Sequence, residues 1–246
     1  MTLRYLFCVV SADDDEPNLG GWAGEGAPLA LVRAGAIAGV VGAVDEARFG
    51  EESLARAMQE VRAVAPYARA HQEVVQHVFE RAAAVVPLAF GSVHRGDDEV
   101  RGALERDEAR LTELLGRFRG MQEWSLRLAR RRARPRPDED AAGAGAAYLA
   151  LRRAELRGDL GAAARAAAQD LDRALAAESA SRRVLAESSG DLVLRAAYLV
   201  PRERVRAVKE AVLGRGRELE AVGLGAELSG PWPAYSFVTR EAVEAR

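Results

Sequence analysis

The sequence predicts an α+β fold in two domains of ferredoxin-like type. Both halves contain short apolar runs and amphipathic helices in the order hairpin, helix, strand, an order that favours antiparallel sheets covered by helices. A stretch rich in proline and opposite charges separates the halves, and 246 residues suffice for two small cores. We therefore expect a ferredoxin-like domain over 1–129, a linker over 130–146, and a second α+β domain with long helices over 147–246.

The first half opens with three expected strands. The run from Leu3 to Val10 is continuously apolar, which is typical of a strand covered on both faces. The runs PLALV and AIAGVVGAV, after an acidic glycine-rich loop, predict two more strands. A helix is expected in EESLARAMQEVRAV, and Pro66 fits the first position of another helix, whose apolar stripe includes His71.

The first half is expected to end with a strand, a helix and a strand. Pro87 interrupts VVPLAFGSV and therefore places that strand at an edge or a bulge. One helix is predicted over DDEVRGALERDEARLTELLGRF, because acids fill its first turn and Arg117 and Arg119 lie at its end. The alternating segment MQEWSLRLA is expected to close the first domain as a strand.

The second half is expected to be richer in helix. An Ala-rich stretch from Tyr148 to about Ser179 predicts one long helix, or two if Gly158 and Gly161 divide it. RRVLAES and DLVLRAAYLVP flank the turn signal SSGD and predict a hairpin. A last helix is expected to open at Pro201 and to end at Gly223.

Charge and cysteine content exclude several classes of protein. The 35 basic and 37 acidic residues leave a net charge of −2, so no general attraction to nucleic acid or anionic membranes is expected. Cys8 is the single cysteine and is expected to pack as a small hydrophobe in a reducing cytoplasm. No secretory signal and no apolar run of roughly 20 residues is visible, which predicts a soluble intracellular protein without a membrane span.

The usual metal, cofactor and phosphate sites are not predicted. The only lysine, Lys209, lies in a predicted helix rather than in a phosphate-binding loop, and the glycine pairs lack a dinucleotide fingerprint. His71 and His77 lie about 120° apart around a helix, so they cannot chelate one ion. Glu73, His77 and Glu80 share a face, for which a solvated helix surface is favoured over a metal site.

Catalytic residues are equally scarce. We expect His71 to be a hydrogen-bonded residue at the margin of the core rather than a ligand or base. Cys8 lies in an apolar strand, and Ser92 precedes His94 by two residues without an acid partner. The sequence therefore predicts neither an enzyme nor a cofactor. A basic run could contact phosphates, but its acidic neighbours favour a solvated linker; it comprises Arg127, Arg130, Arg131, Arg132, Arg134 and Arg136.

The segment GPWPAYSF, Gly230 to Phe237, is the most informative motif. Pro231 and Pro233 cannot donate ladder hydrogen bonds, so the segment cannot be the middle of a central strand. If it stays extended, one face carries Trp232, Ala234 and Ser236, and the other carries Pro233, Tyr235 and Phe237. One aromatic face is expected to cover the second domain's core, and a functional interpretation gives the other face, or the edge beside the prolines, to a binding partner.

This motif, together with four others, resembles the GvpF/GvpL family of gas vesicle proteins. Members of that family typically end in Gly-Pro-Trp-Pro-Pro-Tyr-Ser-Phe, from which GPWPAYSF departs only at Ala234. Further matches span nearly the whole chain in the family's order: RYLFCVV, VVPLAFGSVH after the helix with His71, GMQEWSLRL, and AAYLVPRERV. Ala234 in place of proline removes one fixed φ angle from the segment.

The resemblance implies an accessory or minor structural protein of gas vesicles, in the cytoplasm and at the vesicle, rather than an enzyme. It implies binding to the small hydrophobic shell protein GvpA and to other accessory proteins, in a chaperone-like role that assists nucleation and prevents aggregation. It also implies a ferredoxin-like domain followed by a second α+β domain with long helices. The residues expected to form or support the partner-binding surface are Trp232, Tyr235, Phe237, Pro231 and Pro233.

Two other classes stay open from the residues alone. An enzyme would require a polar pocket, for example around His71, Glu73 and His94. A nucleic-acid-binding module would use a ferredoxin-like sheet with exposed aromatic residues, together with the arginines between Arg130 and Arg136. The oligomeric state, and the choice between an F-type and an L-type member, are not predicted.

Overall fold

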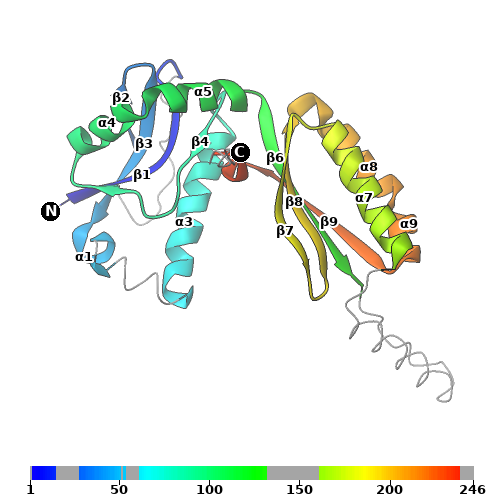
Figure 1. Cartoon of the computed structure of the whole chain (residues 1–246). Helices are drawn as coiled ribbons and strands as arrows, with labels where there is room; N and C mark the ends of the chain where they lie inside the picture. The colour runs from blue at the N-terminus through cyan, green and yellow to red at the C-terminus, as the bar shows by residue number, and fades with distance from the viewer. Residues whose placement is uncertain (1, 15–27, 51, 54–60, 132–160, 239–246) are drawn as a thin grey trace, which may run out of the picture. The chain divides into compact units, whose positions relative to one another are not determined.

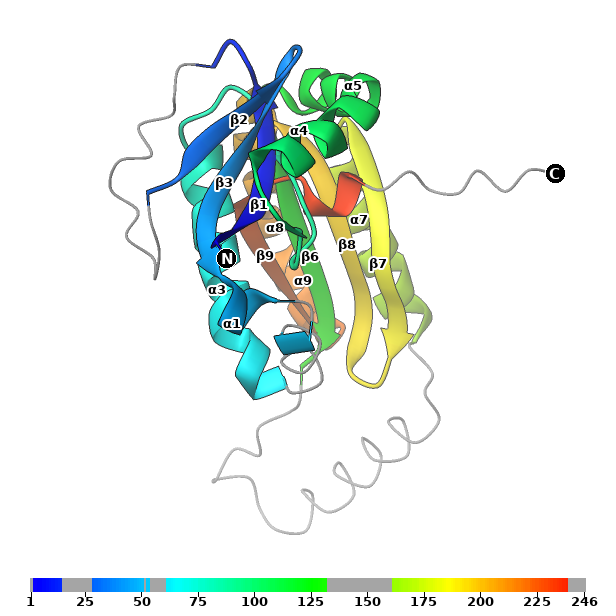
Figure 2. The same cartoon turned by 90° about the vertical axis from the view of Figure 1, so that its left-hand side faces the viewer.

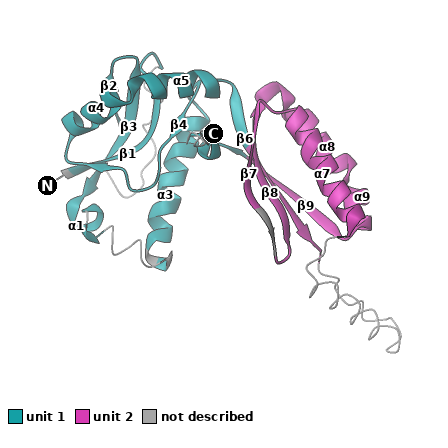
Figure 3. Ribbon diagram, viewed as in Figure 1, with its two compact units in different colours: residues 1–123, 231–246 teal, residues 124–230 magenta. Residues whose placement is uncertain are grey.

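The computed structural model describes the chain except for residues 1, 15–27, 51, 54–60, 132–160 and 239–246 (Figure 1, and turned by 90° in Figure 2). Contacts between residues divide it into two compact units, Met1–Glu123 with Pro231–Arg246, and Trp124–Gly230 (Figure 3). Helices and strands occur in both units, which confirms the predicted α+β class.

The sheet of the first unit is built around its first strand. Strand β1 (Thr2–Ser11) pairs antiparallel with β3 (Ile37–Asp45), which pairs antiparallel with β2 (Ala30–Ala34). Two short strands also pair with β1, namely β4 (Val86–Pro87) and β5 (Val93–His94). The order β2-β3-β1-β4 is the ferredoxin-like strand order, although the chain between β1 and β2 is largely outside the described residues.

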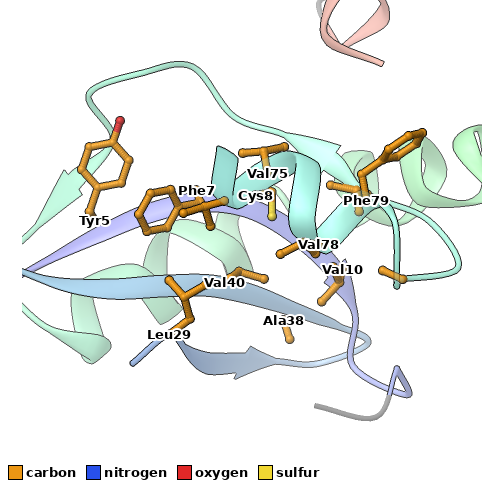
Figure 4. Packing of buried hydrophobic residues seen from close by; sticks show 13 residues of the cluster. Tyr5, Phe7, Cys8, Val10, Leu29, Ala38, Val40, Val75, Val78 and Phe79 are labelled. Carbon is orange, nitrogen blue, oxygen red and sulfur yellow. The ribbon is translucent and has the colours of Figure 1, made fainter. Parts of the chain in front are cut away.

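Helices cover both faces of this sheet, which explains the continuous apolar runs in β1 and β3. Helix α3 (Val61–Phe79) packs Val75 and Val78 over Cys8 on one face (Figure 4). On the other face, a Cβ added to Gly39 would lie 3.1 Å from Cδ1 of Leu104 in the helix α4 (Asp97–Arg106). The prediction of a strand buried on both sides is therefore confirmed.

Two helix boundaries in this unit differ from the sequence predictions. Pro66 lies inside α3 instead of opening it, where it lacks the N–H that would bond to the carbonyl four residues earlier. The helix predicted over residues 97–118 is two, α4 and α5 (Glu108–Phe118), divided at Asp107. Asp107 has a non-helical φ of −119° and its carboxylate accepts from Arg110, which gives the break a local reason.

The segment around Pro87 is also two elements rather than one. β4 and β5 each hold only two residues, and Leu88 to Ser92 form no strand between them. Pro87 nevertheless lies at the edge position predicted for it, since β4 ends the strand order. A short helix, α1 (Glu46–Phe49), follows β3 with Asp45 as its N-cap. The helix expected over 51–64 falls mainly outside the described residues.

The second unit has the ferredoxin-like succession of elements. Its sheet has the order β7-β8-β6-β9. In chain order the unit comprises β6 (Met121–Arg130), α7 (Ala162–Ala177), β7 (Ser181–Ser189), β8 (Leu192–Pro201), a 3₁₀ turn (Arg202–Arg204), α8 (Val205–Gly214), α9 (Gly216–Ala221) and β9 (Leu224–Trp232). Figure 1 shows α7, α8 and α9 on the same side of this sheet.

One apolar core joins these helices to the sheet. Leu171 and Leu175 of α7 are fully buried against Trp124, Leu126 and Tyr198 from the two central strands. The hydroxyl of Tyr198 donates to Asp172 Oδ1 at 2.6 Å, and Arg182 Nε of β7 donates to the same oxygen at 2.6 Å. This polar bridge ties α7 to the hairpin at the margin of the core.

Several predictions for the second half are confirmed and one is corrected. The hairpin β7–β8 is antiparallel and turns at Gly190, whose φ is +60°. Gly223, with φ +75°, follows the last helical residues as predicted. The last helix is divided into α8 and α9 at Arg215, which donates to Asp170 of α7 at 2.7 Å. Only the later part of the stretch from Tyr148 to Ser179 is described, as α7.

The predicted domain limits need correction at both junctions. Strand β6 does not close the first sheet but is a central strand of the second, so the chain passes between units at Glu123 and Trp124 rather than near residue 129. The segment from Pro231 onward groups with the first unit, not with the second domain. Of the predicted linker 130–146, Arg130 ends β6, and the residues from 132 onward lie outside the described chain.

Substitution of two leucines tests the core of the second unit. Leu171→Ala should lower the free energy of unfolding by about 2–5 kcal/mol, because it removes buried methyl groups and leaves a cavity. Leu213→Ala, on α8, is the matched control because Leu213 is 78% exposed, and its effect should stay within about 0.5 kcal/mol. Chemical denaturation followed by circular dichroism measures both, and equal effects would contradict this core.

Candidate functional site

The segment that carries the terminal motif leaves its strand and turns into the first unit. β9 ends at Trp232, and Tyr235 to Phe237 form a 3₁₀ turn. The turn is closed by hydrogen bonds from Tyr235 N to the Pro233 carbonyl, 2.7 Å, and from Phe237 N to the Ala234 carbonyl, 3.0 Å. The segment therefore does not stay extended beyond Trp232, so the alternation of faces expected for an extended segment does not apply to the residues of this turn.

A buried carboxylate holds the turn in place. Glu123 is only 6% exposed, and its two oxygens accept separately from Ser236: Oε2 from the backbone N–H at 2.8 Å and Oε1 from the hydroxyl at 2.7 Å. Arg110 Nη1 of α5 donates to the carbonyl of Val238 at 3.3 Å. A buried carboxylate is costly without donors, so these bonds stabilise the position of the segment.

The aromatic side chains of the segment have different surroundings. Tyr235 packs against the apolar cluster of the first unit that contains Tyr5 and Cys8, and Phe237 is 5% exposed. Burial raises the pKa of the Tyr235 hydroxyl well above its usual range, and the nearby Cys8, Tyr5 and Glu123 raise it further. The core covered by the segment is therefore that of the first unit, which corrects the expectation that it covers the second.

Trp232 is the aromatic residue of the motif that lines a surface groove. The groove has a volume of about 460 Å³ and runs along helix α3. Its lining comprises Trp232 and, from α3 and the turn after it, Arg69, Gln72, Glu73, Gln76, His77, Glu80 and Arg81. Pro231 is exposed beside Trp232, whereas Pro233 is buried. Of the five predicted binding residues, Trp232 and Pro231 are thus at the surface, Pro233 and Phe237 are buried, and Tyr235 packs against the core.

The polar side chains of the groove are only partly paired. Gln76 Nε2 donates to Glu80 at 3.1 Å, and Arg81 lies 3.7 Å from Glu80. Within the described part of the chain, Arg69 and Glu73 make no ion pair although they are one helical turn apart. Gln76 Oε1 and His77 Nε2 are buried and have no hydrogen-bond partner among the described residues. The groove therefore offers one aromatic surface and both signs of charge.

His71 has the structural position predicted for it. It is 5% exposed, and its Nδ1 lies 3.2 Å from the hydroxyl of Tyr5, which also accepts from the Gly91 N–H at 2.8 Å. The ring stacks on Phe7 with centroids 5.8 Å apart. Burial lowers the pKa of His71 to about 4, so the imidazole is neutral near pH 7. The prediction of a hydrogen-bonded histidine at the margin of the core is confirmed.

The other candidates for chemistry do not converge on a site. Ser92 Oγ lies 3.3 Å from His94 Nε2, but no carboxylate bonds to His94 within the described chain. Cys8 is fully buried, and burial raises the pKa of its thiol far above the usual range. Across the described residues no group of histidine, cysteine, aspartate and glutamate side chains is arranged to hold a metal ion, and Glu73, His77 and Glu80 line the groove along α3.

The basic run is described only in part. Arg127 lies 3.9 Å from Glu227, and Arg131 donates to Glu220 at 2.6 Å. Arg132, Arg134 and Arg136 lie outside the described residues. The aromatic residues on the central strands of the second sheet, Trp124 and Tyr198, pack into the core beneath the helices rather than on the opposite face. No helix in the described ranges is both long and apolar enough to cross a bilayer.

Comparison with known proteins identifies the class to which this fold and terminal motif belong. The family described as "Gas vesicle synthesis protein GvpL/GvpF" matches residues 3–239. The chain is 32% identical over 250 residues to "Gas vesicle protein L" of Streptomyces sp. strain CB03234, covering 96% of this chain and 92% of that protein. The chain belongs to the GvpL/GvpF family of gas vesicle proteins, which confirms the resemblance drawn from the motifs.

Solved structures support the same fold. The crystal structure of GvpF from Anabaena sp. PCC7120 is similar with a TM-score of 0.70 at 14% identity, covering 98% of each chain. GvpF from Microcystis aeruginosa gives a TM-score of 0.68 at 16% identity, covering 98% of this chain and all of that one. At such low identity these matches show that the fold is shared.

Sequence reasoning missed Glu123 and the groove. Glu123 belongs to the Gly-x-x-Glu-Trp strand, and its acidic side chain beside buried Trp124 was a signal for a buried partner. The partner, Ser236, lies far along the chain, and pattern reasoning could not pair the two. The groove was not predicted because the α3 side chains that line it have the sequence pattern of an ordinary solvated helix face.

Removal of the Ser236 hydroxyl tests how much its hydrogen bond to Glu123 stabilises the fold. Ser236→Ala should lower the free energy of unfolding by about 1–3 kcal/mol, since a buried carboxylate oxygen loses its donor. Ser125→Ala is the control, because Ser125 lies on the same strand and its hydroxyl makes no hydrogen bond within the described chain. Denaturant titration compares the variants, and equal losses would show that the Glu123 contact contributes little.

The lowered pKa of His71 predicts a pH dependence of stability. Because the pKa is about 4 in the folded chain and about 6.5 when unfolded, the unfolded chain binds the proton first as the pH falls. The contribution is therefore complete above pH 6.5 and is lost between pH 6.5 and pH 4, by roughly 3 kcal/mol. His71→Gln should flatten this part of the stability profile in denaturation measured at several pH values. An unchanged slope would contradict the assignment.

Proposed function

We propose that this protein is a non-enzymatic accessory protein of gas vesicle formation that acts in the cytoplasm and at the vesicle. It binds the hydrophobic shell protein GvpA and other accessory proteins, and it thereby assists nucleation and prevents aggregation. Family membership supports a role in gas vesicles. What we infer beyond family membership is the partner that the protein binds and the step of gas vesicle formation at which it acts.

The observation that carries the proposal is the position of Trp232. It lines the groove with α3, whereas Tyr235 and Phe237 of the same motif are taken up by the core. An aromatic side chain at the wall of a groove supplies a large contact area for an apolar side chain of a partner. Arg69 and Glu73 add charges of both signs that can fix the orientation of a bound segment.

Such a surface suits the problem that a hydrophobic shell subunit presents. Before assembly, exposed apolar patches and strand edges of such a subunit promote aggregation. A groove with one aromatic wall and polar side chains binds an apolar segment reversibly, because only part of the contact is apolar. Reversible binding is what an assembly factor requires, since the subunit must be released into the shell.

The described residues favour this reading over the alternatives. An enzyme would need converging ionisable groups, but Ser92 and His94 have no acid beside them and Cys8 is buried. A nucleic-acid-binding sheet would need exposed aromatic residues, whereas Trp124 and Tyr198 face the core. Neither alternative is supported by a specific site among these residues.

Capture of co-expressed GvpA tests the proposal. Trp232→Ala should reduce GvpA capture roughly tenfold or more, because loss of a central aromatic contact typically costs 2 kcal/mol or more. Leu213→Ala on α8 removes another exposed apolar side chain and should leave capture unchanged. Tyr235 and Phe237 are unsuitable for this test, since their loss would disturb the core. Equal capture by both variants and the wild-type protein would reject the groove as the binding surface.

A further inference from the structure

The first unit contains a built acceptor site for a peptide, already occupied by the chain's own segment. We define this acceptor site as Glu123, Arg110 and the part of the apolar cluster that receives Tyr235. We propose that it also accepts the same segment, Pro231–Val238, from a second copy of the chain, so that two copies exchange their segments. The inference concerns contact between copies and stands apart from GvpA binding.

Recognition of the segment is polar and specific. Both oxygens of Glu123 bind Ser236, one through the backbone N–H and one through the hydroxyl, at 2.8 and 2.7 Å. Arg110 binds the Val238 carbonyl two residues further on, at 3.3 Å. These three bonds recognise two backbone groups and one side chain within a stretch of three residues, as the bonds of a peptide-binding site do. An identical segment from another copy presents the same groups in the same geometry.

The aromatic residues add apolar recognition on the same short stretch. Tyr235 packs against the cluster of Tyr5 and Cys8, and Ala234 and Phe237 are 4% and 5% exposed. The acceptor site therefore covers the side chains of Ala234, Tyr235 and Phe237, on either side of the hydrogen-bonded Ser236. Removal of the segment would uncover this part of the cluster, so an empty acceptor site favours recapture of a segment from any source.

The connection to the rest of the chain permits exchange. The segment follows the whole second unit in sequence and enters the first unit only at Pro231. Gly230 immediately before it has φ +145°, a conformation that glycine adopts readily and that allows the chain direction to change. Pro231 and Pro233 have restricted φ angles, so the segment keeps much of its shape when released and loses less entropy on binding again.

Concentration decides which copy's segment occupies the site. A short connection gives the chain's own segment an effective concentration of the order of millimolar. In dilute solution the internal contact therefore prevails, and the protein is a monomer with respect to this site. Exchange becomes competitive where copies are crowded to similar concentrations, or where the internal contact is broken. The second condition can be created by mutation, which gives the test.

The test uses two full-length variants with complementary defects. The acceptor-defective variant carries Glu123→Gln and Arg110→Met and keeps an intact segment. The segment-defective variant carries Tyr235→Ala and Phe237→Ala and keeps an intact acceptor site. Different affinity tags on the two variants allow capture of mixed dimers after co-expression. GvpA capture is tested separately with Trp232→Ala, which leaves Glu123, Arg110 and the residues of the segment that they bind unchanged.

We expect the two variants together to form a mixed dimer at least tenfold more abundant than either variant forms with a differently tagged copy of itself. Pairs with the same defect lack either an intact donor or an intact acceptor and serve as matched controls. If both variants remain soluble and folded by circular dichroism, and no mixed dimer is captured, the proposal is overturned.

A labelled peptide gives a second readout that does not depend on co-expression. The nine residues Gly230–Val238, with a fluorophore at the amino end, should bind the segment-defective variant saturably and the acceptor-defective variant at least tenfold more weakly. The wild-type protein should also bind weakly, because its own segment competes. Equal fluorescence anisotropy curves for the two variants would overturn the proposal even if the co-expressed variants precipitate.

Discussion

The buried carboxylate of Glu123 is the contact on which the arrangement of this chain depends. Its two oxygens accept from the backbone and the hydroxyl of Ser236, a residue that lies beyond the entire second unit in sequence. A buried carboxylate stabilises a fold only while it keeps its donors, since the desolvated charge is otherwise unfavourable. The first unit is therefore stabilised when the segment that follows the second unit returns to it and supplies the donors for Glu123.

The position of Trp232 follows from this contact. Because Ser236 is fixed and Tyr235 enters the apolar cluster, the backbone before them is held against the first unit. Trp232 is the last residue of β9 and lies three residues before Tyr235, so it is placed along α3 without being taken into the core. The family motif thus combines residues that anchor the segment with one that faces the groove.

Much of the secondary structure was predictable, because periodicity and turn residues act locally. The strands β1, β3 and β8, the hairpin at Gly190 and the end of the last helix at Gly223 all follow from short patterns. The break at Asp107 was not predictable from the apolar stripe, which continues through it. The assignment of β6 to the second sheet was missed for a different reason: its alternation indicates a strand but does not say which sheet receives it.

The site was predictable in its residues but not in their roles. Proline and aromatic content singled out Gly230 to Phe237, yet the division between buried Tyr235 and groove-lining Trp232 depends on a 3₁₀ turn and a distant carboxylate. The same topology has a consequence for synthesis on the ribosome. Translation of the second unit must be finished before the residues that complete the first unit emerge, an interval of roughly 5–20 s at ordinary elongation rates. During that interval the nascent first unit has an open core edge, so the later-made ferredoxin-like unit gains its full sequence before the earlier-made unit does.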